Sequence, residues 1–144
     1  MGAFLGFISA LLTQYIWNTS NDRIQRRSLK IALKTEATSN LSSIRHKGLS
    51  QSTSAAFVEL YDTAVWEAAI ATDKIRLITD ADLAATVARM YARIDAARKW
   101  DLLQVQLLVQ GTYNEGLFDM LSENVTVARR SVLSAIEDFL KKVT

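Results

Sequence analysis

Gly2-Ala-Phe-Leu-Gly-Phe-Ile-Ser-Ala-Leu-Leu-Thr-Gln-Tyr-Ile-Trp17 is a stretch near the start of the chain with no charged side chain. Its sixteen residues would extend roughly 24 Å as an α-helix, slightly less than the ~30 Å hydrocarbon core of a bilayer. Tyr15 and Trp17 stand at its end, where aromatic side chains gather at a membrane interface. The stretch therefore predicts a short N-terminal transmembrane helix.

The basic residues give this predicted helix a direction. Arg23, Arg26 and Arg27 follow it at once, and residues 18–50 hold seven basic groups against two acids. Residues 51–144 hold the other ten basic groups against thirteen acids. Because cytoplasmic flanks of membrane helices carry the excess of Lys and Arg, we expect a single-pass cell-membrane protein with its N-terminus outside. Residues 1–20 would be the anchor and residues 21–144 a cytoplasmic domain.

Other interpretations of the N-terminal stretch remain open at this point. A run of sixteen residues is also compatible with a buried helix of a soluble protein or with an interfacial helix. A cleaved signal peptide would have a basic n-region and a small-x-small cleavage site, and neither is convincing here. A myristoylation signal requires Ser or Thr at position 6, where this chain has Gly6.

Small residues recur along one side of the predicted membrane helix. Gly2, Gly6 and Ala10 are spaced four apart, and Ser9 and Thr13 lie beside them. Small side chains let helices in lipid approach closely, and hydroxyls bond across such contacts. The pattern predicts a membrane helix contact between copies, and hence a homo-oligomer, although such spacings also arise by chance in membrane helices.

The composition predicts an all-α fold. The chain of 144 residues is 49% hydrophobic and 22% charged, which excludes a disordered protein. It contains no proline and only five glycines, so little interrupts long helices. It contains no cysteine, which excludes disulfides, thiolate metal sites and cysteine nucleophiles.

Helical periodicity divides the remainder into four segments. Residues 22–46 place Leu29, Leu33, Ala37 and Leu41 at i+4 spacing and, with no breaker after Trp17, continue the membrane helix as one rod. We expect further helices over 55–72, 79–111 and 112–142, joined by short connections, which favours an antiparallel bundle of about four long helices. Thr79 with Asp82 and Thr112 with Glu115 predict the starts of the last two helices. The predicted inward residues are Phe57, Tyr61, Val65, Ala68 and Ala69, then Leu83, Val87, Met90, Ile94, Ala97, Val105 and Leu108, then Leu117, Leu121, Val125, Ala128, Val132, Ile136, Phe139 and Val143.

Catalytic and metal-binding patterns are lacking in the sequence. His46 is the only histidine and lies in a basic stretch, whereas a positioned base needs an orienting partner. The carboxylates are scattered, there is no Glu-x-x-His pair of the kind that binds metals in bundles, and there is no Gly-rich phosphate loop. We therefore expect no catalysis, no metal and no cofactor.

Two groups of polar residues are candidates for a site. Glu36 and Asn40 lie one turn apart on the predicted inner side of the first helix, and Trp66 and Tyr91 lie on helices that should face them. Buried polar groups must be paired, so these four predict a hydrogen-bond network that fixes the register of the bundle, with a ligand pocket as the alternative.

The second group is basic. Paired guanidinium groups from neighbouring helices would suit a nucleotide or another anionic ligand, although Asp95 and Asp101 offer these arginines ordinary ion pairs. Nucleic acid is not an expected partner, because the region beyond residue 50 is net acidic. The candidate anion-binding residues are Arg89, Arg93, Arg129 and Arg130.

The chain also resembles a group of small prokaryotic membrane-anchored proteins. The resemblance rests on Glu36-Ala-Thr-Ser-Asn40, Tyr61-Asp-Thr-Ala-Val-Trp66-Glu, Asp80-Ala-Asp-Leu83 and Met90-Tyr91-Ala-Arg-Ile94. The group's patterns are Glu-x-x-x-Asn, Ala-x-x-Trp-Glu and Leu followed by Tyr-x-x-Ile along successive helices, and Glu36-Ala-Thr-Ser-Asn40 fits the first of these. The likeness covers roughly residues 29–95 and implies a helical cytoplasmic module with no known chemistry.

Three functional hypotheses follow. The first is a non-enzymatic, membrane-anchored, self-associating protein whose bundle serves assembly or sensing, with membrane lipid and further copies as its partners. The second is a membrane effector gated by a nucleotide or other anion, as used in prokaryotic antiviral defence. The third is an accessory subunit of a larger membrane complex, in which an exposed apolar stripe meets another protein.

Overall fold

The computed structural model describes residues 2–48, 61–110 and 115–143, with side chains for 13–46, 61–110 and 116–143. Within these ranges every regular element is helical, which confirms the all-α class. The elements are α1 (Gly2–Ser43), α2 (Ala64–Ala71), α3 (Ala81–Gln110) and α4 (Glu115–Val143). A π-helical turn, Ile44–Gly48, extends α1, and a 3₁₀ turn, Lys74–Leu77, follows α2.

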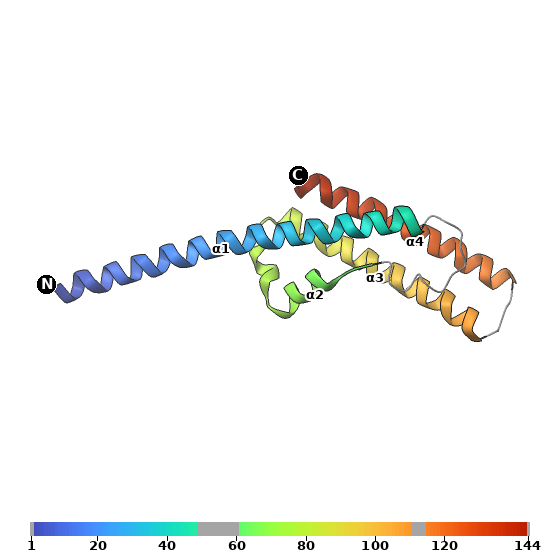
Figure 1. Cartoon of the computed structure of the whole chain (residues 1–144), viewed down its shortest axis with the longest axis horizontal. Coiled ribbons are helices and arrows are strands. Elements are labelled where there is room, and N and C mark those ends of the chain that lie inside the picture. The colour runs from blue at the N-terminus through green and yellow to red at the C-terminus, as the bar shows by residue number, and fades with distance from the viewer. Residues whose placement is uncertain (1, 49–60, 111–114, 144) are drawn as a thin grey trace.

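The first helix is a single rod of 42 residues, about 63 Å long at ~1.5 Å per residue. The predicted continuity through Trp17 is thus confirmed. Figure 1 shows its N-terminal part standing away from the other helices. No described side chain from residue 13 to residue 28 is buried, and Leu29 is the first that is. In the part of the chain that the structure describes, no helix combines the length and hydrophobicity needed to cross a membrane. The predicted transmembrane anchor stays a prediction.

The bundle is built on the hairpin of α3 and α4, with the C-terminal half of α1 lying along α4 (Figure 1). Most of the apolar residues of α1, α3 and α4 that the periodicity placed inside meet in one core, together with Ala69 and Leu77 from the short central elements. The core comprises Leu29, Leu33, Ala37, Ile44, Tyr61, Ala69, Leu77, Val87, Met90, Tyr91, Ile94, Ala97, Val132, Ile136, Phe139 and Val143.

The second predicted helix is shorter than expected. Residues 61–63 are not helical, and α2 has eight residues instead of the predicted run over 55–72; Phe57 lies outside the described residues. The Asp62 carboxylate accepts a hydrogen bond from the Ala64 backbone N–H at 3.0 Å, a local bond that competes with helix. Ala68, predicted to face inward, is exposed.

The third helix begins at Ala81, two residues after the predicted start at Thr79. The Asp80 carboxylate accepts the backbone N–H groups of Asp82 and Leu83 at 2.9 and 3.0 Å. This satisfies two of the helix's orphan donors, so Asp80 and not Thr79 is the cap. The matching signal of the last helix, Thr112, lies outside the described residues.

At the end of the hairpin where α3 finishes and α4 begins, fewer side chains are buried than predicted. Leu108 and Leu117, both expected inside, are 41% and 38% exposed. Figure 1 shows the reason, because α3 and α4 reach beyond the C-terminal end of α1. The periodicity of a helix gives the direction of its inner face but not where its partner stops.

Candidate functional site

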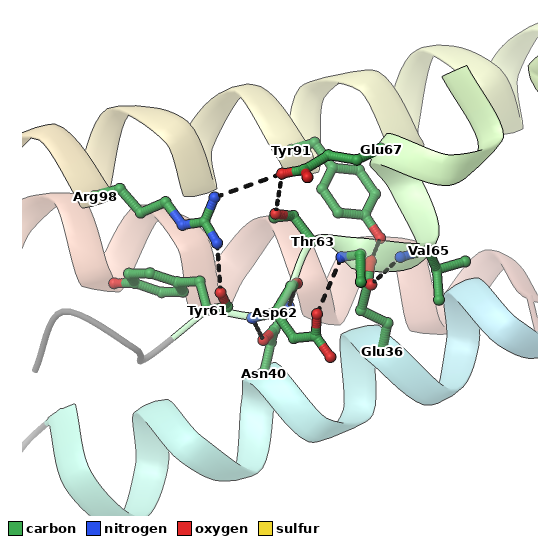
Figure 2. A network of polar contacts seen from close by, with 10 residues as sticks. Glu36, Asn40, Tyr61, Asp62, Thr63, Val65, Glu67, Tyr91 and Arg98 are labelled. Carbon is green, nitrogen blue, oxygen red and sulfur yellow. Dashed lines mark hydrogen bonds and ion pairs between the residues drawn. The ribbon is translucent and has the colours of Figure 1, made fainter. Parts of the chain in front are cut away.

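The candidate site is a junction at which α1 holds the segment leading into α2. Glu36 and Asn40 are 4% and 1% exposed, and both point from α1 toward residues 61–65 (Figure 2). Their i,i+4 spacing puts them one above the other on the bundle-facing side of the helix. They do not bind one another; each reaches a different part of the same segment.

Asn40 pairs with the backbone of Asp62. Its Nδ2 donates to the Asp62 carbonyl and its Oδ1 accepts the Asp62 N–H, both at 2.7 Å. One amide thereby satisfies the donor and the acceptor of a residue that belongs to no helix. The pairing fixes the position of this segment along α1.

Glu36 binds the start of α2. Its Oε2 accepts the Val65 backbone N–H at 2.7 Å, and its Oε1 accepts the hydroxyl of Tyr91 from α3. A carboxylate is favoured at this position because helix N-termini present unpaired N–H groups and positive potential. Burial raises the pKa of Glu36, and the bonds from Tyr91 and Val65 oppose that rise. Burial and the neighbouring Glu36 raise the pKa of Tyr91 as well.

An aromatic stack completes the contact between α2 and α3. The rings of Trp66 and Tyr91 lie parallel, with centroids 4.6 Å apart and an interplanar angle of 5°. Beside them is a cavity of about 320 Å³ between the two helices. Its lining combines this stack and small alanines with three charged groups, Glu67, Asp95 and Arg98. Two carboxylates and one guanidinium suit an anionic ligand poorly.

Arg98 closes the other side of the junction. It donates to the Tyr61 carbonyl at 2.6 Å and lies 3.9 Å from the Glu67 carboxylate. Glu67 in turn accepts the Thr63 hydroxyl at 2.6 Å. The bonds that Asn40, Glu36 and Arg98 make in Figure 2 hold residues 61–67 against α1 and α3.

A buried ion pair lies nearby in the α3–α4 hairpin. The Arg129 guanidinium donates to Asp101 at 2.7 Å, and their side chains are only 11% and 4% exposed. Burial raises the pKa of Asp101 against the lowering effect of Arg129. Burial, followed by the charge of Asp101, also raises the pKa of Tyr61.

The other predicted anion-binding arginines lie elsewhere. Arg89, Arg93 and Arg130 are exposed, whereas Arg129 is engaged inside the protein with Asp101. The structure thus assigns Arg129 a different environment from its three companions. His46 is exposed, and the described residues contain no cluster of three or more potential metal ligands.

The predicted membrane contact lies almost entirely outside the described side chains. For Gly2, Gly6, Ser9 and Ala10 the structure gives the helical backbone of α1 alone, and Thr13 is exposed. The sequence reasoning missed Asp62 and Arg98 as members of the junction, and it expected Asp101 as an ion-pair partner of the arginines but not as a buried one. Asp101 had a readable signal, because it continues the inward spacing of Ile94 and Ala97 along α3.

Comparison with known proteins gives no match. No protein-family model matches the chain, and neither a curated protein nor a solved structure is significantly similar to it. The junction contains a carboxylate of raised pKa, but both of its oxygens accept hydrogen bonds from the protein. Such a group positions helices.

Proposed function

We propose that this protein is a non-enzymatic, self-associating membrane protein, anchored by the N-terminal part of α1, whose bundle serves assembly or sensing. One observation carries the proposal: α1 leaves the bundle before Leu29 and continues as a helix on which no described side chain is buried. Tyr15, Ile16 and Trp17 are 70%, 63% and 73% exposed there. An unpacked helix is marginal in water, and clustered apolar exposure marks an interaction surface. A bilayer meets both needs.

The length and charges of the segment are compatible with this placement. The uncharged stretch falls roughly 6 Å short of a typical hydrocarbon core, a mismatch that local thinning of the bilayer accommodates at modest cost. Arg23, Arg26 and Arg27 are exposed on α1 just beyond it, where their long side chains would reach the headgroups. Their side of the membrane would be the cytoplasm.

The sensing or assembly role rests on the continuity of α1. The same helix that carries the proposed anchor also carries Glu36 and Asn40, which hold residues 61–65. A tilt or rotation of the anchor would therefore act directly on the start of α2. This gives the bundle a physical route for responding to events at the membrane, or for imposing its own state on the anchor.

The anchor is tested by extraction of membranes that contain the full-length protein. We expect the wild type to stay with the membrane in alkaline carbonate and to leave it only in detergent. Ile8→Arg places a charge near the middle of the apolar stretch, which costs about 2.5–3.5 kcal/mol of insertion free energy, and should move the protein out of the membrane fraction. Ile70→Arg, at a 54% exposed position of α2, is the matched control and should not. Release of the wild type by carbonate would refute the anchor.

The mass of the purified particle in detergent separates the remaining hypotheses. A multiple of the chain mass of 16.1 kDa supports self-association. A stoichiometric unrelated chain would support the accessory-subunit hypothesis instead. The ligand-gated hypothesis requires a bound nucleotide or other anion that is lost in Arg89→Gln or Arg93→Gln, while the bundle remains folded by circular dichroism.

A further inference from the structure

One face of α1 carries a regular stripe that no part of the described chain covers. Its positions alternate in steps of four and three, which is the heptad spacing of helices that pair along their length. All of its residues are exposed. We name it the outward stripe; it comprises Trp17, Asn21, Ile24, Ser28, Ile31, Thr35, Thr38 and Ser42.

The outward stripe lies opposite the face that α1 turns to the bundle. At about 100° per residue, Ile24 and Ile31 are roughly half a turn of the helix away from Leu33 and Asn40. Leu33 and Asn40 are 2% and 1% exposed, whereas Ile24 and Ile31 are 61% and 65% exposed. The helix therefore has two distinct packing faces, and the bundle uses one of them.

The chemistry of the stripe suits another helix. The hydroxyls of Thr35 and Thr38 donate to backbone carbonyls within α1, at 3.0 and 2.8 Å. Their hydroxyl donors are therefore satisfied within the helix, and their methyl groups are available for packing. Short side chains leave a shallow hollow of about 510 Å³ at this end of the stripe, lined by Lys34, Thr35, Thr38, Ser39 and Ser42. Small residues allow a partner backbone to come close, and Ile24 and Ile31 supply apolar contact.

We propose that a second copy of this chain packs in parallel on the outward stripe, so that the two α1 helices pair through their cytoplasmic parts. This rests on the proposed function, because two anchors inserted in the same direction bring identical helices together in parallel and at the same depth. The pairing is symmetric, with each copy offering the same residues to the other.

The charges beside the stripe favour the parallel direction. Arg27 and Lys34 lie along one flank, whereas Gln25, Ala32 and Ser39 lie along the other. In a parallel heptad pair one flank faces the opposite flank of the partner, so that basic residues meet neutral ones. In an antiparallel pair the two basic flanks would face each other and repel.

The area that the outward stripe can bury indicates how strongly two copies would pair through it. From Trp17 to Ser42 the helix rises about 38 Å, and a contact strip about 10 Å wide would bury roughly 800 Å² over both copies. Stable interfaces bury about 1,200–2,000 Å². Contact along the whole of α1, about 63 Å, would bury roughly 1,260 Å² over both copies and so reach the lower value. The cytoplasmic stripe alone thus gives a weak contact that depends on the membrane parts of α1.

The absence of cysteine makes a direct test available in membranes that contain the full-length protein. Ile24→Cys and Ile31→Cys should form disulfide-linked dimers on mild oxidation, because parallel pairing brings identical stripe positions within the ~4.4–6.8 Å Cα separation that a disulfide needs. Lys30→Cys, next to Ile31 and also exposed, points to another side and should cross-link at least about tenfold more slowly. Equal rates at the three positions, no dimer, or cross-links to a chain of different mass would overturn the proposal.

A second measurement separates this inference from the anchor itself. Ile24→Glu with Ile31→Glu should at least halve the fraction of dimer seen by mass in mild detergent, whereas Lys30→Glu should leave it unchanged. Carbonate extraction of the same variants reports the anchor independently. If carbonate releases the wild type from the membrane while the cysteine variants still cross-link, the anchor alone is refuted. If the wild type stays in the membrane but the cysteine variants do not cross-link, the pairing alone is refuted.

Discussion

Asn40→Ala should destabilise the bundle more than any other single polar substitution in α1. The Asn40 side chain is 1% exposed and makes two backbone hydrogen bonds of 2.7 Å to Asp62. Each bond contributes about 0.5–1.5 kcal/mol, and the partly buried donor and acceptor that remain add a desolvation cost of their own. We expect a loss of about 2–4 kcal/mol in the free energy of unfolding. Ser39→Ala, at the adjacent exposed position, should cost under about 0.5 kcal/mol.

Thermal unfolding in mild detergent, followed by circular dichroism, measures the global effect. At roughly 2–4 °C per kcal/mol for a domain of this size, the midpoint should fall by about 6–12 °C, taking a loss near 3 kcal/mol. Hydrogen exchange measures the local effect, because the Asp62 amide loses its acceptor while the Val65 amide keeps Glu36. A midpoint within about 2 °C of the wild type, or unchanged exchange at Asp62, would refute the assignment of Asn40 as the residue that holds this segment.

Two further predictions concern the buried charges. Burial raises the pKa of Glu36 above its ordinary 4.5, so the native state binds the proton more tightly than the unfolded chain. The contribution of Glu36 to stability is then greatest below about pH 4.5 and falls as the pH rises from there through the raised folded pKa. Glu36→Gln should remove this part of the pH dependence in denaturation curves, with Asp101 still contributing a dependence of the same sign; an unchanged slope would contradict the burial of a titrating Glu36. For the pair of Asp101 and Arg129, either Asp101→Leu or Arg129→Leu alone leaves a buried charge uncompensated and should cost about 3–5 kcal/mol. The double variant should be more stable than either single variant, and additive losses in a double-mutant cycle would show that the two do not act as a pair.

Much of the fold was readable because it depends on periodicity and on the absence of breakers. With no proline in the chain, α1 runs unbroken through residues 2–43, and the inward rows of α3 and α4 fall where i, i+3 and i+4 spacing puts them. The start of α2 was not readable. It depends on the local bond from the Ala64 N–H to the Asp62 carboxylate and on Asn40, which binds Asp62 across 22 positions; local propensity does not contain the second of these.

The junction was half readable for the same reason. Glu36 and Asn40 are two polar residues one turn apart on the predicted inner face, which predicts that each has a hydrogen-bond partner. Their actual partners include the backbone groups of Asp62 and Val65, which every residue possesses, so no side-chain pattern identifies them. Arg129 shows that a side-chain pattern can also fail to separate a buried residue from an exposed one. Its sequence neighbour Arg130 looks equivalent, yet one step of about 100° along a helix separates a buried ion pair from an exposed side chain.

The junction and the outward stripe are linked through the rotation of α1 about its own axis. Glu36 and Asn40 are tied to residues 61–65 by three bonds of 2.7 Å, and these bonds determine which side of α1 faces the bundle. The opposite side is then fixed as well, because α1 contains no proline and no glycine after Gly6 at which a kink would absorb a twist. A variant that weakens the junction should therefore also make the orientation of the outward stripe, relative to the bundle, less well defined. In the Asn40→Ala background, cross-linking at Ile24→Cys should lose its advantage over Lys30→Cys even when the anchor remains in the membrane. If the advantage persists in full, the contact between copies is set by the N-terminal part of α1 and not by the bundle.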